Sequence, residues 1–229
     1  MQFIFESRKH MGTILMTAAV AVGMGLALAL YSVGAKAQED AAGAENSFAL
    51  KGLGQATCNQ YLQERGAESG VYGRFMSWTQ GYLSAYNQMQ SDTVDIMPWQ
   101  STGLQASLIT EYCKQNREAR YFQAVAWLVA YWRDDRLQSR SEAIEVTAND
   151  RTITIYTEIL RRAQEALSER GHYDGPIDGE YGDGTRAAFQ AFQKANNLQQ
   201  TGLPDQRSLF ALFRGGDNAA PASTDGGEQ

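Results

Sequence analysis

Glycine occurs five times in a short stretch between positions 171 and 184, and this stretch constrains the fold more strongly than any other. Glycine adopts backbone conformations that are costly for other residues, so such a run predicts a tight loop. Asp178 within it can bond nearby backbone amides, as aspartate often does in turns. Asp183 or Thr185 can then cap a following helix. The sequence therefore predicts a preorganised loop that leads into a helix start, where free amides can also accept carboxylates.

Apolar residues at helical spacing lie on both sides of this loop. The first series precedes Gly171, the second follows Thr185 and the third ends the apolar part of the chain. The apolar positions are Ile155, Ile159, Ala163, Ala166 and Leu167; Ala188, Phe189, Phe192 and Ala195; and Leu209, Leu212 and Phe213. These series predict three short helices joined by glycine-rich turns, in a compact bundle over residues 152–214.

The region from 47 to 136 is predicted to be helical throughout. Its apolar residues recur at steps of three and four, which gives each segment one apolar face. The series are Phe75, Trp78, Tyr82 and Tyr86; Leu104, Leu108 and Tyr112; and Phe122, Val125, Val129 and Trp132. Breaks are expected at 66–70, at 91–102 and at 115–117, and a short first helix carries Cys58.

The chain has two cysteines, Cys58 and Cys113, which allow one intramolecular pairing. In an oxidising compartment a disulfide between them is the expected state, and it would tie the first helix of this region to the third. A pair of metal ligands and a reactive thiol are the alternatives. Metal binding would need more ligands than the sequence offers, because His172 is the only histidine after residue 37.

The amino-terminal segment has the parts of a secretory signal peptide. Basic residues at 8–10 precede a run without charge over 11–33, and Ala35-Lys36-Ala37 follows as a small-residue cleavage site. The alternative is an uncleaved membrane anchor, because the uncharged run is long enough to cross a bilayer. Both interpretations place residues 38–229 outside the cytoplasm, and we expect a cleaved signal peptide over 1–37 and a periplasmic or secreted protein.

Three polar segments have no apolar periodicity. Residues 38–46 and 215–229 are predicted to be disordered, since they cannot bury enough surface to offset ordering. Residues 137–151 are predicted to be a linker between two domains, 47–136 and 152–214. The expected fold class is all-α, with an amino-terminal helical domain clipped by a disulfide and a carboxy-terminal bundle of three helices.

The net charge restricts the possible partners. Removal of residues 1–37 takes away Arg8, Lys9, Lys36 and Glu6, which changes the formal net charge from -6 to -8. A chain this acidic does not bind nucleic acid or anionic lipid through its bulk charge. We expect no nucleic-acid partner, and a membrane partner only if the amino-terminal segment stays uncleaved.

Most of residues 164–212 carry a pattern that closely resembles the peptidoglycan-binding-like domain, a three-helix module attached to many cell-wall hydrolases. The matching residues are Gln164, Leu167, 171–173, 175–179, Gly182, Thr185, Ala188, 192–193, Leu198, 201–202, Ser208 and Leu212. Asn197 and Ser208 depart mildly from the family pattern. Asp178-Gly179 is spaced from Thr185 as Thr201-Gly202 is from Ser208, which is a faint internal repeat. The resemblance implies binding to bacterial peptidoglycan without chemistry.

The residues of this pattern are expected to divide into two groups. Turn and helix-face residues are interpreted as structural, namely Asp178, Gly179, Gly182, Thr185, Phe192 and Gln193. Side chains around the loop are the candidates for ligand binding through rings and hydrogen bonds, namely Tyr173, Asp174, Tyr181, Arg186 and Gln190.

Residues 57–116 resemble, at fewer positions, the HdeA-like periplasmic helical family, whose known members are acid-stress chaperones. The matching residues are 57–58, 61–62, Trp78, 81–83, Asn87, Ile109, Cys113 and Asn116. The resemblance implies an alternative function as a periplasmic stress chaperone or an interaction module for periplasmic proteins, in which acid exposes apolar surface.

The sequence lacks the machinery of the common wall-degrading enzymes. One histidine after residue 37 does not suffice for a usual zinc hydrolase, and paired cysteines would leave no free thiol nucleophile. We therefore expect no catalytic residues, no metal site and no cofactor. A glycosidase built on two carboxylates stays open, because acidic residues are numerous.

Overall fold

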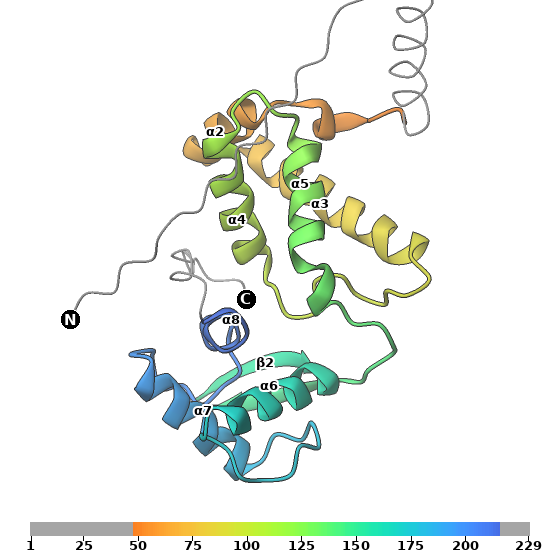
Figure 1. Ribbon diagram of the computed structural model, residues 1–229. Coiled ribbons are helices and arrows are strands. Elements are labelled where there is room, and N and C mark those ends of the chain that lie inside the picture. The colour runs from red at the N-terminus through yellow and green to blue at the C-terminus, as the bar shows by residue number, and fades with distance from the viewer. Residues whose placement is uncertain (1–47, 216–229) are drawn as a thin grey trace, which may run out of the picture. The chain divides into compact units, whose positions relative to one another are not determined.

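The computed structural model describes residues 48–215, and the elements are labelled in Figure 1. The predicted signal peptide, the disordered segment 38–46 and almost all of the predicted tail lie outside these residues. The first part of the described chain consists of helices alone. They are the 3-10 helix η1 (Gly52–Gln55), α2 (Cys58–Gly66), α3 (Gly70–Met89), α4 (Thr102–Gln115), α5 (Tyr121–Trp132) and the 3-10 helix η2 (Arg133–Asp135).

Short polar side chains fix where these helices begin. Thr57 and Gln60 form a reciprocal capping box at the start of α2. The Ser69 hydroxyl accepts hydrogen bonds from two amides of α3, and the Ser101 hydroxyl accepts one from Leu104 in α4. Between α2 and α3 the chain turns at Glu68, whose φ of 47° lies in the left-handed region. The predicted break at 66–70 is confirmed.

Aromatic side chains dominate the core of this first part. Tyr61, Phe75, Tyr121 and Trp132 are fully or almost fully buried there. The Tyr61 and Tyr121 rings lie 5.1 Å apart between centroids, and Phe75 packs edge-on against both. Burial of these rings from α2, α3 and α5 supplies the apolar contact that holds the helices together.

The predicted disulfide is confirmed. Cys58 at the start of α2 is joined to Cys113 in the last turn of α4, and both residues are fully buried. The bond therefore ties the first helix of this part to the third. It closes a loop across 55 positions, for which chain-entropy arguments give a stabilisation of about 4 kcal/mol.

A β-hairpin corrects the all-α prediction. Strands β1 (Ala143–Ala148) and β2 (Arg151–Tyr156) pair antiparallel, with Val146 opposite Ile153. The first strand lies inside the predicted linker 137–151, and the second takes up the start of the first predicted helix, so Ile155 belongs to a strand. Alternation explains the difference, because Val146, Ala148 and Ile155 turn to the core while Glu145, Thr147 and Thr154 stay exposed. The fold is mostly helical with one small sheet.

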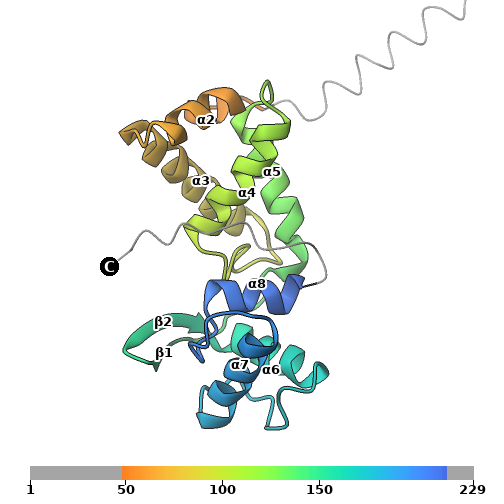
Figure 2. The same ribbon diagram turned by 90° about the vertical axis from the view of Figure 1, so that its left-hand side faces the viewer.

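The three predicted carboxy-terminal helices are present. They are α6 (Thr157–Glu169), α7 (Asp183–Ala195) and α8 (Gln206–Arg214), and Figure 2 shows the hairpin beside them. A second core forms between them and includes Ile159 and Leu160 of α6, Phe189 and Phe192 of α7, and Leu209 of α8. Gly171, with φ of 72°, ends the α6 segment and begins the glycine-rich loop.

Helix α8 links the two cores. Phe210 on α8 is buried in the first core beside Trp132, while Trp99 packs against both cores and lies 5.4 Å from Phe213 between ring centroids. Arg214 forms an ion pair of 2.7 Å with Asp135. From Leu50 onward the described chain is one compact unit by its contacts, and the domain limits at 136 and 152 stay a prediction. Among residues 48–215, no helix combines the length and apolar character that crossing a bilayer requires.

Candidate functional site

Two fully buried glutamines organise the carboxy-terminal part. Gln164 lies on α6 and Gln193 on α7, and neither side chain is exposed to solvent. A buried amide side chain is costly unless its donor and acceptor atoms are both paired. Each glutamine meets this requirement by binding one glycine turn.

Gln164 holds the turn around Gly179. Its Oε1 accepts a hydrogen bond of 2.7 Å from the Gly179 amide, and its Nε2 donates to Asp178 Oδ1 at 2.9 Å and to the Glu180 carbonyl at 3.0 Å. The Thr185 hydroxyl, at the start of α7, donates to the same carbonyl at 3.0 Å. The turn, α6 and the start of α7 are therefore joined through one side chain.

Gln193 repeats this arrangement at the turn around Gly202. Its Oε1 accepts from the Gly202 amide at 2.8 Å, and its Nε2 donates to the Leu203 carbonyl at 3.0 Å and to Ser208 Oγ at 2.8 Å. Ser208 thus takes the place that Thr185 takes in the first turn. The internal repeat in the sequence corresponds to two equivalent clamps.

Both turns require glycine. Gly179 has φ of 76°, and a Cβ atom there would lie 2.6 Å from the Thr157 carbonyl oxygen. Gly202 has φ of 74°, and a Cβ atom there would lie 2.9 Å from Arg186 Cγ. Other residues would be strained in these backbone conformations and would also lack the space.

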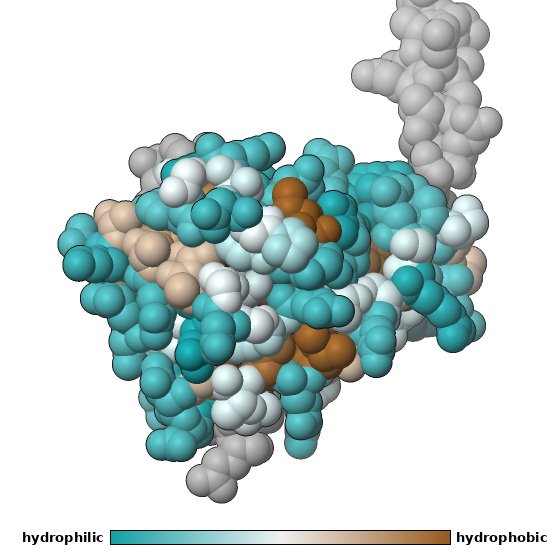
Figure 3. All heavy atoms as spheres, turned by 90° about the horizontal axis from the view of Figure 1, so that it is seen from below, coloured by the Kyte–Doolittle hydropathy of each residue, from teal (hydrophilic) through white to brown (hydrophobic). Residues whose placement is uncertain are grey.

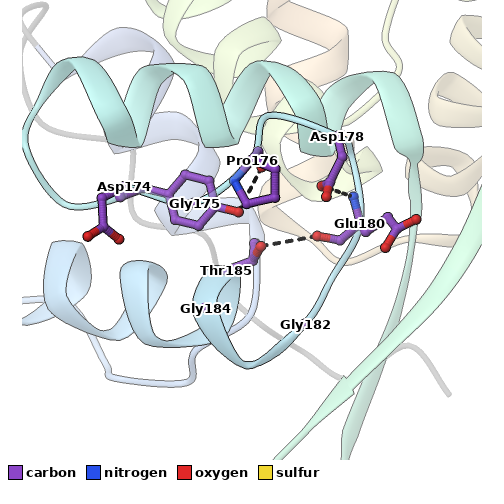
Figure 4. Close-up of a pocket in the computed structure, with 9 residues that line it drawn as sticks. Asp174, Gly175, Pro176, Asp178, Glu180, Gly182, Gly184 and Thr185 are labelled. Carbon is purple, nitrogen blue, oxygen red and sulfur yellow. Dashed lines mark hydrogen bonds between the residues drawn. The ribbon is translucent and has the colours of Figure 1, made fainter.

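The first turn borders a surface hollow of about 230 Å³, shown in Figure 4. The loop from 173 to 180 and the start of α7 line it, through Tyr173, Asp174, Gly175, Pro176, Asp178, Glu180, Gly182, Gly184 and Thr185. The Tyr173 hydroxyl donates to the Pro176 carbonyl at 2.8 Å. A Cβ atom on Gly175 would lie 2.6 Å from the Tyr173 ring, so this glycine leaves room for the ring. The walls are held in place by contacts within the loop.

The carboxylates of the hollow differ in their partners. Asp178 accepts hydrogen bonds from the Glu180 amide and from Gln164, and these bonds hold the pKa of its carboxyl below the usual range. Asp174 and Glu180 have exposed side chains, and they extend at opposite ends of the hollow in Figure 4. Asp178 therefore stabilises the turn, and the other two carboxylates face solvent.

The second turn is covered by side chains. The Tyr181 hydroxyl donates to the Gly202 carbonyl at 2.7 Å, and burial raises the pKa of this hydroxyl. Arg186 and Gln190 of α7 lie against Gly202, and Asn149 at the tip of the hairpin donates to the Thr201 carbonyl at 3.1 Å. Gly179 itself is buried like Gly202, and the solvent exposure at the first turn comes from Asp178 and Glu180 on either side of it.

The five predicted ligand residues therefore fall into two groups. Tyr173 and Asp174 line the hollow. Tyr181, Arg186 and Gln190 lie over the second turn instead, and Arg186 is also paired with Asp183 at 2.9 Å. The structure does not bring all five together around one cavity.

Of the residues interpreted as structural, Thr185, Phe192 and Gln193 are buried, as that interpretation requires. Gly182 differs, because it is the exposed N-cap of α7 and a Cβ atom there would meet nothing within 4 Å. The sequence interpretation omitted Gln164 and Glu180 from its candidates. The place of Gln164 in the family pattern is the signal that could identify it, whereas no sequence signal marks Glu180.

The hollow offers hydrogen-bond acceptors and one aromatic ring. Within residues 48–215 there is no cluster of three histidine, cysteine or acidic side chains that could hold a metal ion. His172 lies edge-on to Phe192, at 5.7 Å between ring centroids, and packs there. Such a surface can bind a polar ligand through hydrogen bonds and ring contact.

Residues 157–212 match the family model described as "Putative peptidoglycan binding domain". The match begins at the first residue of α6 and ends within α8, so it contains both glutamine clamps and the hollow. No match was found among curated proteins or among solved structures. The HdeA-like resemblance of the first part stays a prediction.

Proposed function

We propose that this chain is an exported, non-catalytic protein that binds peptidoglycan at the hollow beside Gly179. The observation that carries the proposal is the position of the hollow. It is an open cavity at the clamped turn, inside the segment that matches the peptidoglycan-binding family model.

The clamps make this site rigid before any ligand arrives. The Gly179 turn is bound by the buried Gln164, and the Tyr173 hydroxyl bonds to the Pro176 carbonyl while Gly175 leaves room for the ring. A site that is already ordered loses little conformational entropy on binding. The hollow can therefore retain a polymer through a few polar contacts.

The non-catalytic part of the proposal is supported by the state of the carboxylates. A glycosidase needs one carboxyl that holds its proton near neutral pH, usually through burial. In the hollow, the pKa of the Asp178 carboxyl is lowered, and Asp174 and Glu180 are exposed. Release of soluble fragments from purified peptidoglycan by the purified protein would contradict this part.

Export is supported by the sequence pattern of residues 1–37 and by the buried Cys58–Cys113 disulfide, a bond that forms in oxidising compartments. Cell fractionation of the full-length chain tests it. We expect a shortened protein outside the cytoplasm, and recovery of an unshortened protein in the cytoplasm would contradict export.

The binding proposal is tested by co-sedimentation with purified peptidoglycan sacculi. We expect the full-length chain to sediment with sacculi and the Gly182→Trp variant to lose most of this binding. Gly182 lines the hollow and a side chain there meets no obstacle, so an indole would obstruct the hollow without straining the backbone.

The matched control is Gly81→Trp. Gly81 is exposed on α3, and a Cβ atom there also meets nothing within 4 Å. This variant should bind as the unchanged protein does. Equal binding by Gly182→Trp, with unfolding curves that show both variants folded, would contradict the hollow as the site.

A further inference from the structure

The charged side chains that line the hollow are all negative. Three of the nine residues that line it are acidic, Asp174, Asp178 and Glu180, and none is lysine, arginine or histidine. The Asp178 carboxyl stays ionised because the Glu180 amide and Gln164 bond to it. Asp174 and Glu180 add a negative charge at each end of the hollow (Figure 4).

The nearest guanidinium groups do not offset this charge, because each has a carboxylate partner. Arg186 is paired with Asp183 at 2.9 Å. Arg161, which packs near Gly179, is paired with Glu158 at 2.9 Å and with Glu165 at 3.5 Å. Asp183 also lies in the first turn of α7, where it opposes the attraction of the helix dipole for anions.

The surroundings of the hollow are also polar. Figure 3 views the molecule from the side of α6 and α7, and this face is mainly hydrophilic with small, separate hydrophobic areas. Ile177, beside the hollow, is a large apolar side chain that is 44% exposed. This face suits a hydrated polymer with hydrogen-bond donors.

We infer that the hollow binds the glycan part of peptidoglycan and rejects the free carboxylates of its stem peptides. This inference rests on the proposed function. Sugar hydroxyls and acetamide N–H groups are donors, and they match the carboxylate and carbonyl acceptors of the hollow. A peptide carboxylate would approach like charges without a cation to receive it, which disfavours binding.

A competition experiment with the full-length chain bound to sacculi tests the inference. The competitors are glycan strands freed of peptide by an amidase and then amidated at the lactyl carboxylates that this cleavage exposes, and soluble stem peptides with free carboxylates. We expect the glycan strands to displace the protein from sacculi, and the stem peptides to need at least about tenfold higher concentration.

The double variant Asp174→Asn, Glu180→Gln removes the charge at both ends of the hollow. We expect it to reduce the difference between the two competitors, and we expect added salt to reduce the difference for the unchanged protein by screening. The matched control is Glu118→Gln, Glu145→Gln, which removes two exposed charges outside the hollow. It should keep the full difference.

Two results would overturn the inference while the proposed function stands. One is displacement by stem peptides at concentrations equal to or below those of glycan strands. The other is a double variant that discriminates as the unchanged protein does. A chain that does not sediment with sacculi at all would overturn the proposed function, and the inference with it.

Discussion

A glutamine side chain carries one acceptor and two donor hydrogens, which matches what a glycine turn leaves unpaired. Gln164 and Gln193 each accept from the glycine amide of a turn and donate to the carbonyl of the residue after that glycine. Because both side chains are buried, loss of either partner would leave a polar atom without water or protein to bond. At each turn one buried side chain therefore pairs both the glycine amide and the carbonyl that follows it.

The first prediction concerns the glycine that Gln164 binds. Gly179→Ala should lower the free energy of unfolding by roughly 2–4 kcal/mol, because the left-handed φ disfavours alanine and the new methyl group meets the Thr157 carbonyl. Urea unfolding followed by circular dichroism measures the change. Gly182→Ser is the control and should be neutral or slightly stabilising, since a serine hydroxyl can cap α7. Similar loss in both variants would contradict the argument.

At this scale the sequence predicted the clamps better than the ligand surface. Gly179, Thr185 and Gln193 could be interpreted correctly as turn and helix-face residues, because their chemistry suits a buried turn. Tyr181 and Arg186 could not be placed, because their position over Gly202 depends on how α7 packs against a turn that follows it in sequence. Such contacts are set by tertiary packing, which spacing alone does not show.

The hairpin is the element that helical periodicity obscured. Ile155 and Ile159 are four residues apart and suggest one helical face, yet β2 ends at Tyr156 and α6 begins at Thr157. The alternation of Ile144, Val146 and Ala148 is the signal that predicts a strand. Asn149 and Asp150 form the turn, with φ of 50° and 61°, values that asparagine and aspartate tolerate better than most residues.

The second prediction concerns this turn. Asp150→Gly should raise the free energy of unfolding by about 0.5–1 kcal/mol, because glycine adopts a φ of 61° without the cost that aspartate carries. Differential scanning calorimetry of the variant and the unchanged protein measures the shift. Asn149→Ala should have the opposite sign, since it removes the hydrogen bond to the Thr201 carbonyl and places alanine at φ of 50°. A lowered melting temperature for Asp150→Gly would contradict the prediction.

The start of α6 carries a network of charges centred on Glu158. Its carboxylate accepts from Arg161 at 2.9 Å and from Arg162 at 3.0 Å, while Arg162 also donates to the Asp135 carbonyl at 2.9 Å. Glu158 therefore orients an arginine that connects α6 to η2. The hydrogen bonds from Arg161 and then Arg162 lower the pKa of the Glu158 carboxyl.

The third prediction follows from the sign of this shift. A carboxyl with a lowered pKa in the folded state stabilises the fold above its ordinary pKa, and the stabilisation is lost as the pH falls through the folded value. Glu158→Gln should cost about 1 kcal/mol near pH 7, and the difference from the unchanged protein should shrink as the pH falls below the ordinary pKa of glutamate and vanish once the folded-state carboxyl is protonated. Urea unfolding at several pH values measures it. A difference that grows toward low pH would contradict the assignment.

On the scale of the whole molecule, α8 serves two cores at once. Leu209 and Leu212 pack into the second core, while Phe210 is 6% exposed and packs into the first. The sequence predicted the inward face of α8, because the bundle needs one. The opposite face also carries apolar side chains. What covers them could not be deduced from residues 205–213, since Trp99 and Trp132 lie far earlier in the chain, outside the helices of the bundle.

Results

Sequence analysis

Glycine occurs five times in the short stretch between positions 171 and 184, which constrains the fold more strongly than any other part of the chain. Glycine adopts backbone conformations that are costly for other residues, so such a run predicts a tight loop. Asp178 within it can bond nearby backbone amides, as aspartate does in turns. Asp183 or Thr185 can then cap a following helix. The sequence therefore predicts a preorganised loop leading into a helix start, where free amides can also bind carboxylates.

Apolar residues at helical spacing lie on both sides of this loop. One series precedes Gly171, a second follows Thr185, and a third lies near the end of the chain. Their apolar positions are Ile155, Ile159, Ala163, Ala166 and Leu167; Ala188, Phe189, Phe192 and Ala195; and Leu209, Leu212 and Phe213. These series predict three short helices joined by glycine-rich turns, in a compact bundle over residues 152–214.

The region from 47 to 136 is predicted to be helical throughout. Its apolar residues recur at steps of three and four, which gives each segment one apolar face. Breaks are expected at 66–70, at 91–102 and at 115–117, and a short first helix carries Cys58. The apolar series are Phe75, Trp78, Tyr82 and Tyr86; Leu104, Leu108 and Tyr112; and Phe122, Val125, Val129 and Trp132.

The chain has two cysteines, Cys58 and Cys113, which allow one intramolecular pairing. In an oxidising compartment a disulfide between them is the expected state, and it would tie the first helix of this region to the third. A pair of metal ligands and a reactive thiol are the alternatives. Metal binding would need more ligands than the sequence offers, because His172 is the only histidine after residue 37.

The amino-terminal segment has the parts of a secretory signal peptide. Basic residues at 8–10 precede a run without charge over 11–33, and Ala35-Lys36-Ala37 follows as a small-residue cleavage site. The alternative is an uncleaved membrane anchor, because the uncharged run is long enough to cross a bilayer. Both interpretations place residues 38–229 outside the cytoplasm. We expect a cleaved signal peptide over 1–37 and a periplasmic or secreted protein.

Three polar segments have no apolar periodicity. Residues 38–46 and 215–229 are predicted to be disordered, since they cannot bury enough surface to offset ordering. Residues 137–151 are predicted to be a linker between two domains, 47–136 and 152–214. The expected fold class is all-α, with an amino-terminal helical domain clipped by a disulfide and a carboxy-terminal bundle of three helices.

The net charge restricts the possible partners. Removal of residues 1–37 takes away three positive charges and one negative charge, which changes the formal net charge from -6 to -8. A chain this acidic does not bind nucleic acid or anionic lipid through its bulk charge. We expect no nucleic-acid partner, and a membrane partner only if the amino-terminal segment stays uncleaved.

Most of residues 164–212 carry a pattern that closely resembles the peptidoglycan-binding-like domain, a three-helix module attached to many cell-wall hydrolases. The matching residues are Gln164, Leu167, 171–173, 175–179, Gly182, Thr185, Ala188, 192–193, Leu198, 201–202, Ser208 and Leu212. The resemblance implies binding to bacterial peptidoglycan without chemistry.

The pattern has mild departures and a faint internal repeat. Asn197 stands where the family usually has glycine, and Ser208 replaces the usual threonine. Asp178-Gly179 is spaced from Thr185 as Thr201-Gly202 is from Ser208. The repeat is consistent with the family.

The residues of this pattern are expected to divide into two groups. Turn and helix-face residues are interpreted as structural, namely Asp178, Gly179, Gly182, Thr185, Phe192 and Gln193. Side chains around the loop are the candidates for ligand binding through rings and hydrogen bonds, namely Tyr173, Asp174, Tyr181, Arg186 and Gln190.

Residues 57–116 resemble, at fewer positions, the HdeA-like periplasmic helical family, whose known members are acid-stress chaperones. The resemblance implies an alternative function as a periplasmic stress chaperone or an interaction module for periplasmic proteins, in which acid exposes apolar surface. The matching residues are 57–58, 61–62, Trp78, 81–83, Asn87, Ile109, Cys113 and Asn116.

The sequence lacks the machinery of the common wall-degrading enzymes. One histidine after residue 37 does not suffice for a usual zinc hydrolase, and paired cysteines would leave no free thiol nucleophile. We therefore expect no catalytic residues, no metal site and no cofactor. A glycosidase built on two carboxylates stays open, because acidic residues are numerous.

Overall fold

The computed structural model describes residues 48–215, and its elements are labelled in Figure 1. The predicted signal peptide, the predicted disordered segment 38–46 and almost all of the predicted tail lie outside the described residues. The first part of the described chain is helical. Its elements are the 3-10 helix η1 (Gly52–Gln55), α2 (Cys58–Gly66), α3 (Gly70–Met89), α4 (Thr102–Gln115), α5 (Tyr121–Trp132) and the 3-10 helix η2 (Arg133–Asp135).

Short polar side chains determine where three of these helices begin. Thr57 and Gln60 form a reciprocal capping box at the start of α2. The Ser69 hydroxyl accepts hydrogen bonds from two amides of α3, and the Ser101 hydroxyl accepts one from an amide of α4. The predicted break at 66–70 is confirmed, because α2 ends and α3 begins there.

Aromatic side chains dominate the core of this first part. Tyr61, Phe75, Tyr121 and Trp132 are fully or almost fully buried. The Tyr61 and Tyr121 rings lie 5.1 Å apart between centroids, and Phe75 packs edge-on against both. Burial of these rings from α2, α3 and α5 supplies much of the apolar contact that holds the helices together.

The predicted disulfide is confirmed. Cys58 at the start of α2 is joined to Cys113 in the last turn of α4, and both residues are fully buried. The bond therefore ties the first helix of this part to the third. It links positions that are 55 residues apart, for which chain-entropy arguments give a stabilisation of about 4 kcal/mol.

A β-hairpin corrects the all-α prediction, so the fold is mostly helical with one small sheet. Strands β1 (Ala143–Ala148) and β2 (Arg151–Tyr156) pair antiparallel. The first strand lies inside the predicted linker 137–151, and the second takes up the start of the first predicted helix, so Ile155 belongs to a strand. Alternation explains the difference, because every second side chain along a strand turns to the core. Val146, Ala148 and Ile155 are the buried side chains of this pattern.

The three predicted carboxy-terminal helices are present. They are α6 (Thr157–Glu169), α7 (Asp183–Ala195) and α8 (Gln206–Arg214), and Figure 2 shows the hairpin beside them. Gly171, with φ of 72°, follows α6 and begins the glycine-rich loop. A second core forms between these helices and includes Ile159, Leu160, Phe189, Phe192 and Leu209.

Helix α8 contacts both cores. Phe210 on α8 is buried in the first core beside Trp132, whereas its neighbour Leu209 belongs to the second. Trp99 packs against both cores and lies 5.4 Å from Phe213 between ring centroids. The two cores are therefore continuous through aromatic side chains.

From Leu50 onward the described chain is one compact unit by its contacts. An ion pair of 2.7 Å between Arg214 and Asp135 adds to the contacts of α8. The domain limits at 136 and 152 stay a prediction. Among residues 48–215, no helix combines the length and the apolar character that crossing a bilayer requires.

Candidate functional site

Two fully buried glutamines organise the carboxy-terminal part. Gln164 lies on α6 and Gln193 on α7, and neither side chain is exposed to solvent. A buried amide side chain is costly unless its donor and acceptor atoms are both paired. Each glutamine meets this requirement by binding one glycine turn.

Gln164 holds the turn around Gly179. Its Oε1 accepts a hydrogen bond of 2.7 Å from the Gly179 amide, and its Nε2 donates to Asp178 Oδ1 at 2.9 Å and to the Glu180 carbonyl at 3.0 Å. The Thr185 hydroxyl, at the start of α7, donates to the same carbonyl at 3.0 Å. The turn, α6 and the start of α7 are therefore joined through one side chain.

Gln193 repeats this arrangement at the turn around Gly202. Its Oε1 accepts from the Gly202 amide at 2.8 Å, and its Nε2 donates to the Leu203 carbonyl at 3.0 Å and to Ser208 Oγ at 2.8 Å. Ser208 thus takes the place that Thr185 takes at the first turn. The internal repeat in the sequence corresponds to two equivalent clamps.

Both turns require glycine. Gly179 has φ of 76°, and a Cβ atom there would lie 2.6 Å from the Thr157 carbonyl oxygen. Gly202 has φ of 74°, and a Cβ atom there would lie 2.9 Å from Arg186 Cγ. Other residues would be strained in these backbone conformations and would also lack the space.

The first turn borders a surface hollow of about 230 Å³, shown in Figure 4. The Tyr173 hydroxyl donates to the Pro176 carbonyl at 2.8 Å, and a Cβ atom on Gly175 would lie 2.6 Å from the Tyr173 ring. Contacts within the loop therefore hold the walls of the hollow in place. The residues that line it are Tyr173, Asp174, Gly175, Pro176, Asp178, Glu180, Gly182, Gly184 and Thr185.

The carboxylates of the hollow differ in their partners. Asp178 accepts hydrogen bonds from the Glu180 amide and from Gln164, and these bonds hold the pKa of its carboxyl below the usual range. Asp174 and Glu180 are exposed, and their side chains extend at opposite ends of the hollow in Figure 4. Asp178 therefore stabilises the turn, while the other two carboxylates face solvent.

The second turn is covered by side chains from the loop and from α7. The Tyr181 hydroxyl donates to the Gly202 carbonyl at 2.7 Å, and burial raises the pKa of this hydroxyl. Arg186 and Gln190 lie against Gly202, within 3.3 Å of where its Cβ atom would be. At the first turn, the Thr157 carbonyl and Arg161 of α6 lie against Gly179.

The tip of the hairpin also covers the second turn. Asn149, between β1 and β2, donates from its side chain to the Thr201 carbonyl at 3.1 Å. Thr201 is buried, whereas Asp178, its counterpart at the first turn, is exposed. Gly179 itself is buried like Gly202, and the solvent exposure at the first turn comes from Asp178 and Glu180 on either side of it.

The five predicted ligand residues therefore fall into two groups. Tyr173 and Asp174 line the hollow. Tyr181, Arg186 and Gln190 lie over the second turn instead. The structure does not bring all five together around one cavity, and whether each contacts a ligand stays a prediction.

The residues interpreted as structural differ in burial and in their place in the fold. Thr185, Phe192 and Gln193 are buried, and Asp178 and Gly179 form the first turn. Gly182 differs, because it is the exposed N-cap of α7 and a Cβ atom there would meet nothing within 4 Å.

Two residues of the site lie outside the predicted set. Gln164 binds the first turn, and its place in the family pattern is the signal that could identify it, since its 15 positions to Gly179 differ from the 9 positions between Gln193 and Gly202. Glu180 lines the hollow, but an acidic residue in a polar loop carries no sequence signal that distinguishes it from its neighbours.

The hollow offers hydrogen-bond acceptors and one aromatic ring. Within residues 48–215 there is no cluster of three histidine, cysteine or acidic side chains that could hold a metal ion. His172 packs edge-on to Phe192, at 5.7 Å between ring centroids. A surface of this composition can bind a polar ligand through hydrogen bonds and ring contact.

Residues 157–212 match the family model described as "Putative peptidoglycan binding domain". The match begins at the first residue of α6 and ends within α8, so it contains both glutamine clamps and the hollow. No curated protein and no solved structure matches the chain. The HdeA-like resemblance of the first part stays a prediction.

Proposed function

We propose that this chain is an exported, non-catalytic protein that binds peptidoglycan at the hollow beside Gly179. The observation that carries the proposal is the position of the hollow. It is an open cavity at a clamped turn, inside the segment that matches the peptidoglycan-binding family model.

The contacts around the hollow make this site rigid before any ligand arrives. The Gly179 turn is bound by the buried Gln164, and the Tyr173 hydroxyl bonds to the Pro176 carbonyl while Gly175 leaves room for the ring. A site that is already ordered loses little conformational entropy on binding. The hollow can therefore retain a polymer through a few polar contacts.

The non-catalytic part of the proposal is supported by the state of the carboxylates. A glycosidase needs one carboxyl that keeps its proton near neutral pH, usually through burial. In the hollow the pKa of the Asp178 carboxyl is lowered, and Asp174 and Glu180 are exposed. Release of soluble fragments from purified peptidoglycan by the purified protein would contradict this part.

Export is supported by the sequence pattern of residues 1–37 and by the buried Cys58–Cys113 disulfide, since such bonds persist in oxidising compartments. Cell fractionation of the full-length chain tests it. We expect a shortened protein outside the cytoplasm. Recovery of the unshortened protein in the cytoplasm would contradict export.

The binding proposal is tested by co-sedimentation with purified peptidoglycan sacculi. We expect the full-length chain to sediment with sacculi and the Gly182→Trp variant to lose most of this binding. Gly182 lines the hollow and a Cβ atom there meets no obstacle, so an indole would obstruct the hollow without straining the backbone.

The matched control is Gly81→Trp. Gly81 is exposed on α3, and a Cβ atom there also meets nothing within 4 Å. This variant should bind as the unchanged protein does. Equal binding by Gly182→Trp, with unfolding curves that show both variants folded, would rule out the hollow as the site.

A further inference from the structure

The charged side chains that line the hollow are all negative. Three of the nine residues that line it are acidic, Asp174, Asp178 and Glu180, and none of the nine is lysine, arginine or histidine. The Asp178 carboxyl stays ionised because the Glu180 amide and Gln164 bond to it. Asp174 and Glu180 add a negative charge at each end of the hollow (Figure 4).

Neighbouring guanidinium groups do not offset this charge, because each has a carboxylate partner. Arg186 is paired with Asp183 at 2.9 Å. Arg161, which lies against the first turn, is paired with Glu158 at 2.9 Å and with Glu165 at 3.5 Å. Asp183 also lies in the first turn of α7, where its charge opposes the attraction of the helix dipole for anions.

The surface around the hollow is polar. Figure 3 views the molecule from below, which is the side of α6 and α7 in Figure 1, and this face is mainly hydrophilic with small, separate hydrophobic areas. Ile177, in the loop that lines the hollow, is 44% exposed. Such a face suits a hydrated polymer that offers hydrogen-bond donors better than it suits an apolar protein surface.

We infer that the hollow binds the glycan part of peptidoglycan and rejects the free carboxylates of its stem peptides. This inference rests on the proposed function. Sugar hydroxyls and acetamide N–H groups are donors, and they match the carboxylate and carbonyl acceptors of the hollow. A peptide carboxylate would approach like charges without a cation to receive it, which disfavours binding.

A competition experiment with the full-length chain bound to sacculi tests the inference. The competitors are glycan strands freed of peptide by an amidase and then amidated at the lactyl carboxylates that this cleavage exposes, and soluble stem peptides with free carboxylates. We expect the glycan strands to displace the protein from sacculi. The stem peptides should need at least about tenfold higher concentration, because like charges oppose their binding.

The double variant Asp174→Asn, Glu180→Gln removes the charge at both ends of the hollow. We expect it to reduce the difference between the two competitors, and we expect added salt to reduce the difference for the unchanged protein by screening. The matched control is Glu118→Gln, Glu145→Gln, which removes two exposed charges outside the hollow. It should keep the full difference.

Two results would overturn the inference while the proposed function stands. One is displacement by stem peptides at concentrations equal to or below those of glycan strands. The other is a double variant that discriminates between the competitors as the unchanged protein does. A chain that does not sediment with sacculi at all would overturn the proposed function, and the inference with it.

Discussion

A glutamine side chain carries one acceptor and two donor hydrogens, which matches what a glycine turn leaves unpaired. Gln164 and Gln193 each accept from the glycine amide of a turn and donate to the carbonyl of the residue after that glycine. Because both side chains are buried, loss of either partner would leave a polar atom without water or protein to bond. At each turn one buried side chain therefore pairs both the glycine amide and the carbonyl that follows it.

The first prediction concerns the glycine that Gln164 binds. Gly179→Ala should lower the free energy of unfolding by roughly 2–4 kcal/mol, because the left-handed φ disfavours alanine and the new methyl group meets the Thr157 carbonyl. Urea unfolding followed by circular dichroism measures the change. Gly182→Ser is the control and should be neutral or slightly stabilising, since a serine hydroxyl can cap α7. A similar loss in both variants would refute the argument.

Residue chemistry predicts the clamps better than it predicts the ligand surface. Gly179, Thr185 and Gln193 can be interpreted from sequence as turn and helix-face residues, because their chemistry suits a buried turn. Tyr181 and Arg186 cannot be placed in this way, because their position over Gly202 depends on how α7 packs against a turn that follows it. Such contacts are set by tertiary packing, which spacing alone does not show.

The hairpin is the element that helical periodicity conceals. Ile155 and Ile159 are four residues apart and suggest one helical face, yet β2 ends at Tyr156 and α6 begins at the next residue. The signal that does predict a strand is the alternation of apolar and polar residues in 143–148. Ile155 fits both a helical step to Ile159 and the alternating pattern of β2. Its place in a strand is therefore evident only when the pairing of β2 with β1 is considered.

The second prediction concerns the hairpin turn, where Asp150 has φ of 61°. Asp150→Gly should raise the free energy of unfolding by about 0.5–1 kcal/mol, because glycine adopts this conformation without strain. Differential scanning calorimetry measures the shift. Asn149→Ala should have the opposite sign, since it removes the hydrogen bond to the Thr201 carbonyl. A lowered melting temperature for Asp150→Gly would show that the turn is not strained.

The start of α6 carries a network of charges centred on Glu158. Its carboxylate accepts from Arg161 at 2.9 Å and from Arg162 at 3.0 Å, while Arg162 also donates to the Asp135 carbonyl at 2.9 Å. Glu158 therefore orients an arginine that connects α6 to η2. The hydrogen bonds from Arg161 and then Arg162 lower the pKa of the Glu158 carboxyl.

The third prediction follows from the sign of this shift. A carboxyl with a lowered pKa in the folded state stabilises the fold above its ordinary pKa, and the stabilisation is lost as the pH falls through the folded value. Glu158→Gln should cost about 1 kcal/mol near pH 7, and its difference from the unchanged protein should shrink as the pH falls below the ordinary pKa of glutamate and vanish once the folded-state carboxyl is protonated. Urea unfolding at several pH values measures it. A difference that grows toward low pH would disprove the assignment.

On the scale of the whole molecule, α8 serves two cores at once. Leu209 and Leu212 pack into the second core, while Phe210 packs into the first. The spacing of apolar residues predicts the inward face of α8, because each helix of a bundle needs one buried apolar face. It does not show what covers the other face, because the partners Trp99 and Trp132 lie far earlier in the chain.

The fourth prediction follows from this shared helix. Because Phe210 is 6% exposed and packs among side chains of the first core, Phe210→Ala should lower the free energy of unfolding by about 3–5 kcal/mol. Since Ser208 of α8 accepts from the Gln193 side chain that binds the Gly202 turn, the loss should appear in both cores together. Hydrogen exchange followed by mass spectrometry measures protection of α5 and of α7 in the unchanged and variant proteins. We expect both helices to lose protection in parallel, whereas loss in α5 with full protection of α7 would mean that the carboxy-terminal bundle folds without the first core.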